Sequence, residues 1–174
     1  LTDISLVERS FWELVFKYEP STLSGVPYTY QVLRRYGSDF IKSLPINVFT
    51  QAGGKLHRDL VLYFHSLLLE SSKLFYVMYG QTEATARISY LPPDSLPAKA
   101  GSIGIAIPNT QIQLDYSEDF GSSNGFNVGQ LVFFGPNVTH GYSLNTQDIY
   151  LSSPPTSLAT GDIGYVDNDG FYYI

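Results

Sequence analysis

Residues 46–80, INVFTQAGGKLHRDLVLYFHSLLLESSKLFYVMYG, carry the clearest structural signal in the first half of this chain. This stretch opens with a short run typical of a buried strand, residues 46–50, which an Ala-Gly-Gly turn at 52–54 follows. Apolar residues at helical spacing come next, and residues 73–78 form a second buried-strand run that ends at Tyr79-Gly80. Strand, turn, helix and strand in this order predict a parallel βαβ unit, and ligands of such sheets bind beyond the carboxyl ends of the strands.

Two helices are expected upstream of this unit. Apolar and aromatic residues recur at helical spacing from Ile4 to Tyr18, with Thr2 or Asp3 as the N-terminal cap. Residues 24–27 are interpreted as a loop, and its last residue, a proline, suits the first turn of a second helix that ends near Gly37.

The pattern changes downstream of a proline-rich linker at residues 91–97. Short runs there predict four strands, at residues 111–114, 130–134, 164–166 and 171–174. The last two flank Asp-Asn-Asp-Gly at 167–170, a strong hairpin turn. We therefore expect an α/β fold: a βαβ-type, partly parallel sheet with flanking helices in residues 1–95, followed by a small antiparallel, distorted β-barrel subdomain in residues 96–174.

Composition limits the classes of function. The 174 residues are 44% hydrophobic and 15% charged, which is typical of a globular chain with a real core. A net charge of −6 without any Lys/Arg cluster argues against nucleic acid or an anionic membrane as a partner. No apolar run approaches the roughly 20 residues of a membrane-spanning helix. The chain has no cysteine, which removes disulfides, thiolate zinc sites and cysteine nucleophiles and fits a cytoplasmic location.

Two motifs far apart in the chain carry the chemistry: Tyr79-Gly80-Gln81-Thr82-Glu83 and Thr160-Gly161-Asp162. Together they supply an aromatic face, hydroxyls and two carboxylates. A phenol ring offers a flat surface on which a base can stack, and a carboxylate is a ligand that Mg²⁺ prefers. The pair of motifs thus suits an adenine, a phosphate, a magnesium ion and a ribose.

The two motifs belong to a longer series. Four segments occur in one order: Thr50-Gln51-Ala52-Gly53-Gly54-Lys55-Leu56, Tyr79-Gly80-Gln81-Thr82-Glu83, Gly129-Gln130-Leu131 through Gly135-Pro136-Asn137-Val138 to Gly141-Tyr142, and Thr160-Gly161-Asp162-Ile163-Gly164 to Asp169-Gly170-Phe171. The series resembles the second half of the large N-terminal domain of adenylate-forming (AMP-binding) enzymes, over roughly residues 24–174. That superfamily includes acyl-CoA synthetases, nonribosomal-peptide adenylation domains and luciferases.

The resemblance implies a nucleotide site. Tyr79 would lie against the adenine face, and Gly53 and Gly54 would line the other side, where the lack of a side chain allows close approach of the backbone. Asp162 would accept hydrogen bonds from the ribose hydroxyls. Gly80 would let the chain turn tightly beside the ligand.

The resemblance also implies a reaction. Enzymes of this kind activate a small-molecule carboxylic acid with ATP, giving an acyl-adenylate and pyrophosphate, and pass the acyl group to a thiol. Thr82 would hydrogen-bond the α-phosphate and Glu83 would hold Mg²⁺, which makes these two the candidate catalytic residues. The thiol would belong to coenzyme A or to the phosphopantetheine of an acyl carrier protein, and fatty acid metabolism is one setting for such a ligase.

Three readings stay open. The parent protein is either a stand-alone ligase or a nonribosomal-peptide-type adenylation domain. A non-catalytic nucleotide-binding or scaffold module is a third reading, which the intact Thr82, Glu83 and Asp162 disfavour. The family's phosphate-gripping loop would precede Leu1 and its C-terminal domain would follow Ile174. We therefore expect the chain to be a fragment that is inactive alone.

Overall fold

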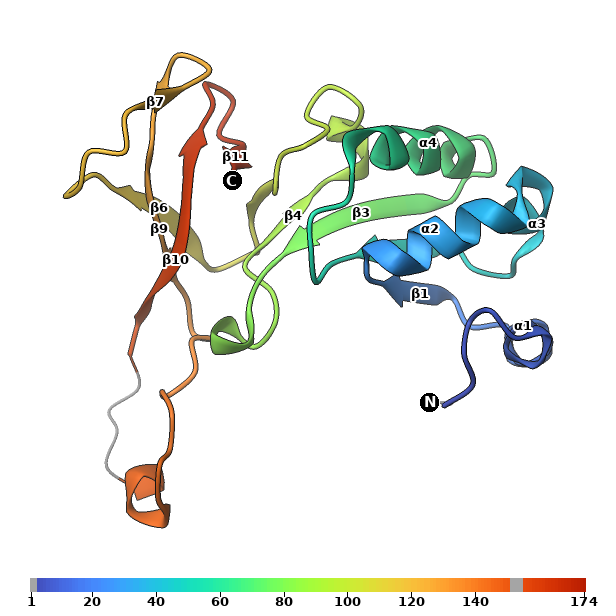
Figure 1. Ribbon diagram of the computed structural model, residues 1–174, viewed down its shortest axis with the longest axis horizontal. Coiled ribbons are helices and arrows are strands. Elements are labelled where there is room, and N and C mark those ends of the chain that lie inside the picture. Colours follow the sequence, from blue (N-terminus) through green and yellow to red (C-terminus); the bar gives the residue numbers. More distant parts are fainter. Residues whose placement is uncertain (1–2, 151–154) are drawn as a thin grey trace. The chain divides into compact units, whose positions relative to one another are not determined.

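The computed structural model describes residues 3–150 and 155–174, which form two compact units (Figure 1). One unit comprises Leu1–Val77 and Leu91–Gly101, and the other comprises Met78–Tyr90 and Ser102–Ile174. Each unit is thus built from two separate stretches of the chain. The segment that carries the Tyr-Gly-Gln-Thr-Glu motif belongs to the same unit as the Thr-Gly-Asp motif.

The first unit contains the predicted parallel βαβ arrangement. Its elements are α1 (Arg9–Tyr18), β1 (Thr22–Gly25), α2 (Pro27–Tyr36), α3 (Ser38–Ser43), β2 (Val48–Gln51), α4 (Arg58–Leu69), the first residues of β3 (Leu74–Tyr79) and the 3₁₀ helix η2 (Pro93–Ser95). β1 pairs with β2 and β2 pairs with β3, both in parallel. Gly25, Gln51 and Val77 are aligned in this register, so the three strands reach the same edge of the sheet.

Aromatic side chains from the helices and the sheet form the core of this unit. Tyr30 of α2, Phe64 of α4 and Phe75 of β3 are almost completely buried, and their ring centroids lie 5.0–6.1 Å apart. α4 presents an apolar stripe at positions 60, 61, 64, 67 and 68, the spacing of one helix face. Such aromatic pairs add about 0.5–1.5 kcal/mol each beyond the area they bury, which fixes α2 and α4 against the sheet.

Two upstream predictions were wrong. The first helix begins at Arg9, not near the residues proposed as caps; its N-cap is Glu8, and Thr2 lies outside the described residues. A turn replaces the expected first helical turns, because the Glu8 N–H donates to the Ser5 carbonyl and the Glu8 carboxylate accepts from the Ser5 N–H. The apolar residues before it therefore follow a helical spacing without forming a helix.

The expected loop at 24–27 was also wrong at its start. Ser24 and Gly25 belong to β1, although neither residue favours strands. Pairing with β2 overrides this preference, and the Thr50 hydroxyl donates to Ser24 Oγ at 2.9 Å. Pro27 does occupy the first turn of α2, and the helix ends at Tyr36 with Gly37 as its C-cap, near the predicted end.

The second unit is an antiparallel sheet with short accessory pieces. Its main strands run in the order β11-β10-β9-β6, and these are the four strands that the sequence predicted. The elements are the 3₁₀ helix η1 (Thr82–Ala84), β4 (Ser89–Leu91, all but its last residue), β5 (Ile105–Ala106), β6 (Gln111–Asp115), β7 (Ser122–Ser123), β8 (Phe126–Asn127), β9 (Gly129–Phe134), the 3₁₀ helix η3 (Thr146–Tyr150), β10 (Ser157–Val166) and β11 (Tyr172–Tyr173). The predicted α/β fold class, with its partly parallel sheet and its curled antiparallel sheet, is confirmed.

The predicted turn between β10 and β11 is present. The Gly170 N–H donates to the Asp167 carbonyl, and Asp167 Oδ1 accepts from the N–H groups of Asp169 and Phe171.

β10 is longer than the predicted run at 164–166 and contains the Thr-Gly-Asp motif. Its register against β9 shifts between Ala159 and Ile163, so the motif occupies an irregularity in the strand. Such irregularities re-aim a side chain relative to a regular strand.

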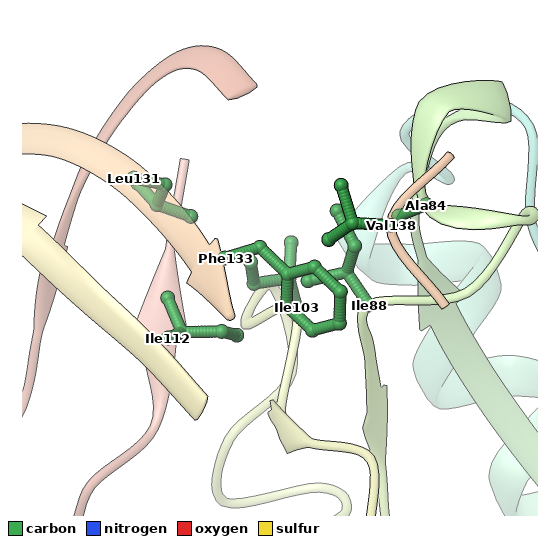
Figure 2. Packing of buried hydrophobic residues seen from close by; sticks show 7 residues of the cluster. All are labelled: Ala84, Ile88, Ile103, Ile112, Leu131, Phe133 and Val138. Atoms are coloured by element: carbon green, nitrogen blue, oxygen red, sulfur yellow. The ribbon is translucent and has the colours of Figure 1, made fainter. Parts of the chain in front are cut away.

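A compact apolar cluster supports the second unit (Figure 2). Its members come from the segment after β3, from three strands or strand-like segments and from the loop after β9: Ala84, Ile88, Ile103, Ile112, Leu131, Phe133 and Val138. Ala84, which directly follows Glu83 of the motif, is fully buried. The Tyr79 side chain packs against the same cluster. The core therefore holds the Tyr-Gly-Gln-Thr-Glu segment directly. Across the described residues, no helix is long and apolar enough to cross a membrane.

Candidate functional site

The two predicted motifs meet in the second unit. The Tyr79 hydroxyl donates a hydrogen bond to Asp162 Oδ2, across 83 residues of sequence. Partial burial raises the pKa of Tyr79 above its usual value near 10, and the bond to Asp162 raises it further. The phenol therefore stays protonated at neutral pH and remains a donor to this carboxylate.

A second contact joins the same motifs. Gln81 Nε2 donates to the Thr160 carbonyl at 3.3 Å, while the Thr160 hydroxyl donates to the Leu131 carbonyl and accepts from the Asp162 N–H. The irregularity in β10 is thus bonded on one side to β9 and on the other to the segment after β3. These bonds fix the backbone that presents the Asp162 carboxylate.

The chain turns sharply between Gly80 and Ile88. η1 occupies Thr82–Ala84, and the next two residues, Thr85 and Ala86, both have positive φ, 46° and 75°. The turn folds back onto its own start, because a Cβ added to Gly80 would lie 2.5 Å from the Ala86 carbonyl oxygen. The close approach explains why glycine occupies this position.

Asn137, in the loop after β9, holds this turn by hydrogen bonds that are called the Asn137 clamp below. Its Nδ2 donates to the Ala84 carbonyl at 2.7 Å and to the Arg87 carbonyl at 3.0 Å. The Thr85 hydroxyl donates back to the Asn137 carbonyl at 3.1 Å. Three hydrogen bonds therefore connect the turn to a residue 50–53 positions away in sequence.

Asn137→Asp should loosen this turn. Aspartate has nearly the same shape but cannot donate, so the Ala84 and Arg87 carbonyls lose their partner and face a carboxylate instead. We expect the free energy of unfolding to fall by about 2 kcal/mol, measured by urea denaturation. Asn127→Asp, at an exposed position of β8, is the matched control. Equal effects of the two substitutions would contradict the clamp.

The Glu83 carboxylate is held by the same loop. The Thr139 N–H donates to the Glu83 backbone carbonyl at 2.8 Å, and the Tyr142 hydroxyl donates to Glu83 Oε1. The bond from Tyr142 lowers the pKa of Glu83, with a smaller contribution from the backbone N–H of Glu83 itself. The side chain is therefore anionic at neutral pH.

Thr82 and Glu83 line a cavity of about 410 Å³, which is within the usual size range of small-molecule sites. Its wall combines these two side chains with the loop after β9 and the start of β10: Val138, Thr139, Gly141, Tyr142, Pro155, Ser157 and Leu158. The Thr82 hydroxyl and the Glu83 carboxylate thus line one cavity, and the rest of its wall is largely apolar.

Gly53 and Gly54 lie in the first unit, in the turn after β2. Both have positive φ, 73° and 143°, and the value at Gly54 is one that side-chain-bearing residues rarely adopt. The buried Gln51 side chain donates from Nε2 to the Gly54 carbonyl at 2.7 Å. The turn packs against α2, because a Cβ added at Gly54 would meet the ring of Pro27 at 3.3 Å.

The predicted metal ligand, Glu83, suits Mg²⁺ in a coordination that substrate phosphates and water complete. Within residues 3–150 and 155–174, no three His, Cys, Asp or Glu side chains gather to hold a metal ion. Mg²⁺ commonly binds through one or two carboxylates plus substrate phosphates and water. The anionic Glu83 beside the Thr82 hydroxyl fits that mode and not an all-protein cage.

Sequence reasoning assigned no role to Asn137, Thr139 or Tyr142. The Gly-Pro-Asn-Val to Gly-Tyr segment was recognisable as part of the motif series, but its partners lie more than 50 residues upstream. Only the folded chain pairs the Asn137 and Tyr142 side chains and the Thr139 N–H with particular atoms of the turn.

The fold and these motifs together define a known class of protein. The family model for the AMP-binding enzyme matches residues 2–143 of the 174. The chain therefore belongs to the AMP-binding enzyme family.

Individual relatives agree with this membership. A 2-succinylbenzoate–CoA ligase of Bacillus cereus is 40% identical over 100 residues, which is 57% of this chain and 20% of that enzyme. Among solved structures, the o-succinylbenzoate CoA synthetase of Bacillus subtilis with the acyl-adenylate intermediate OSB-AMP is similar with a TM-score of 0.74 at 24% identity, covering 94% of this chain and 32% of that one. The complex of VinN with L-aspartate has a TM-score of 0.72 at 24% identity, covering 95% and 40%. The chain spans about a fifth of the length of the curated relatives that it matches.

Proposed function

We propose that this chain is the adenylate-binding part of an ATP-dependent carboxylic acid ligase. The full protein would join a carboxylate to the α-phosphate of ATP, giving an acyl-adenylate and releasing pyrophosphate, and would then transfer the acyl group to a thiol. The observation that carries this proposal is the meeting of Tyr79 with Asp162 and of Glu83 with the loop after β9 in one unit of a chain of the AMP-binding family.

Tyr79 and Asp162 would bind the nucleoside. The Tyr79 hydroxyl occupies Oδ2 of Asp162 and so orients the carboxylate, whose remaining acceptor positions suit the ribose hydroxyls. The Tyr79 ring offers its face to adenine, and base–aromatic stacking is worth about 1–3 kcal/mol. Gly53 and Gly54 would allow the backbone to approach the base.

Thr82 and Glu83 would act at the phosphates. The exposed Thr82 hydroxyl would donate to the α-phosphate as negative charge develops there. Mg²⁺, bound by the Glu83 carboxylate, would neutralise the charge of the phosphates that the acid must approach. The reaction requires positioning and charge neutralisation more than a protein nucleophile.

The relatives support coenzyme A as the acyl acceptor, because the curated ones are CoA ligases. A carrier-bound phosphopantetheine is the second candidate, and the cytoplasmic location stays a prediction. The acid is an open choice: similar structures carry ligands as different as OSB-AMP and L-aspartate on one fold. 2-Succinylbenzoate is the first acid to test, followed by fatty acids, other aromatic acids and amino acids.

ATP–pyrophosphate exchange by the full-length protein tests this proposal. We expect one acid class to support exchange, and Thr82→Ala to lower the rate about 100-fold, because a donor to the developing charge is lost. Thr22→Ala, at an exposed position of β1, is the matched control and should leave the rate unchanged.

Two outcomes would count against the proposal. Exchange that survives Thr82→Ala at the full rate would remove this hydroxyl from the reaction. A folded full-length protein that binds AMP but exchanges with no acid would favour the non-catalytic module. We expect the 174 residues alone to show no exchange.

A further inference from the structure

We infer that Tyr142 is a positioning residue for the metal-binding carboxylate: its hydroxyl sets the orientation in which Glu83 meets the divalent cation. The inference rests on the proposed function, because it concerns the same site. It assigns a role to a residue outside both motifs that identify the nucleotide site.

The geometry of the Tyr142 side chain carries the inference. Tyr142 is 81% exposed, so burial of its ring does not explain its place in the structure. Its hydroxyl nevertheless reaches Glu83 Oε1, which lies 59 residues earlier in the sequence. An exposed tyrosine whose hydroxyl contacts the carboxylate of the Tyr-Gly-Gln-Thr-Glu motif acts on that carboxylate and contributes little to the core.

The loop that carries Tyr142 is itself attached to Glu83. The Thr139 N–H donates to the Glu83 carbonyl, and the Thr139 hydroxyl accepts from the Gly141 N–H at 3.1 Å. The loop therefore contacts both the backbone and the side chain of Glu83. Two contacts of this kind fix both the position and the rotation of the carboxylate, which one contact alone does not.

The bond to Tyr142 is compatible with a bound metal. A carboxylate has about four lone-pair sites on its two oxygens, so a hydroxyl on Oε1 leaves others for a cation. Thr82, Glu83 and Tyr142 line the same cavity, which places the hydroxyl beside the metal and phosphate positions proposed above. Partners that orient a metal-binding group typically change metal affinity or activity by about 10–100-fold when they are removed.

Metal affinity tests this role directly. Binding of Mn²⁺ to the full-length protein with a non-hydrolysable ATP analogue is measured by electron paramagnetic resonance of the free ion. We expect Tyr142→Phe to weaken the affinity about tenfold, since the contact is exposed and belongs at the low end of that range. Tyr165→Phe, which removes a hydroxyl that accepts from Asn124 in the same unit, should change nothing.

A double-mutant cycle separates positioning from a general structural effect. In a Glu83→Gln background, Tyr142→Phe should weaken Mn²⁺ binding by no further factor, because the two groups act through one contact. An affinity that is unchanged or tighter in Tyr142→Phe overturns the inference, and a tighter one shows that the hydroxyl competes with the metal. A melting temperature lowered well below that of Tyr165→Phe also overturns it. A wild-type protein that binds the analogue but takes up no Mn²⁺ overturns the metal role of Glu83. It also overturns the proposed function at that step.

Discussion

Gly80→Ala should lower the free energy of unfolding by about 3 kcal/mol and abolish nucleotide binding. The added methyl group would lie 2.5 Å from the Ala86 carbonyl oxygen and 2.8 Å from the Arg87 Cα. Both are backbone atoms, so neither can rotate away, and the turn that carries Thr82 and Glu83 must move. Urea denaturation measures the stability, and titration with AMP measures the site.

Gly121→Ala is the control for this substitution. Its added methyl group meets no atom within 4 Å, but its φ of 76° disfavours any residue with a side chain. We expect a cost of about 1 kcal/mol and unchanged AMP binding. If Gly80→Ala costs no more than this control, the turn is more pliable than its contacts indicate.

Asp162→Asn should lower kcat/KM for ATP about 100-fold in the full-length protein, with little loss of stability. Asparagine keeps the shape but replaces one acceptor oxygen with a donating amide, which the Tyr79 hydroxyl and the ribose hydroxyls cannot both satisfy. A hundredfold corresponds to about 2.7 kcal/mol, a plausible loss for hydrogen bonds to a charged group. ATP–pyrophosphate exchange at varied ATP concentration gives the value.

Two further substitutions test the assignment of Asp162. Asp115→Asn, at a carboxylate that accepts hydrogen bonds from Ser117, should leave kcat/KM unchanged. Tyr79→Phe keeps the ring and removes only the hydroxyl that orients Asp162, so we expect a loss of a few-fold, smaller than that of Asp162→Asn. An effect of Asp162→Asn confined to the KM of the acid would contradict a ribose contact.

The sequence predicted those features whose signals are local. The helix at Pro27, the βαβ order and the hairpin turn at Asp167 each depend on residues within a few positions of one another, and each was confirmed. The start of α1 was missed because apolar spacing continues through a turn that the Ser5–Glu8 hydrogen bonds stabilise. β1 was missed because its Ser24 and Gly25 become a strand only through pairing with β2.

In the candidate site, too, local motifs could be predicted from the sequence and long-range contacts could not. Motif order identified Tyr79, Thr82, Glu83 and Asp162 as candidates. Their mutual contacts could not be predicted from the sequence, because Tyr79 and Asp162 are far apart in it. No local pattern indicates which tyrosine contacts which carboxylate. The roles of Asn137 and Tyr142 depend on the same long-range pairing.

The long sequence separations in the site have a consequence for folding. The bonds from Tyr79 to Asp162, from Asn137 to Ala84 and from Tyr142 to Glu83 close loops of 83, 53 and 59 residues. Loop closure of that length costs entropy before any contact is gained, and it slows folding relative to local contacts. During synthesis, the Tyr-Gly-Gln-Thr-Glu segment therefore leaves the ribosome long before its partners. We therefore expect the candidate site to be among the last parts of the second unit to become ordered.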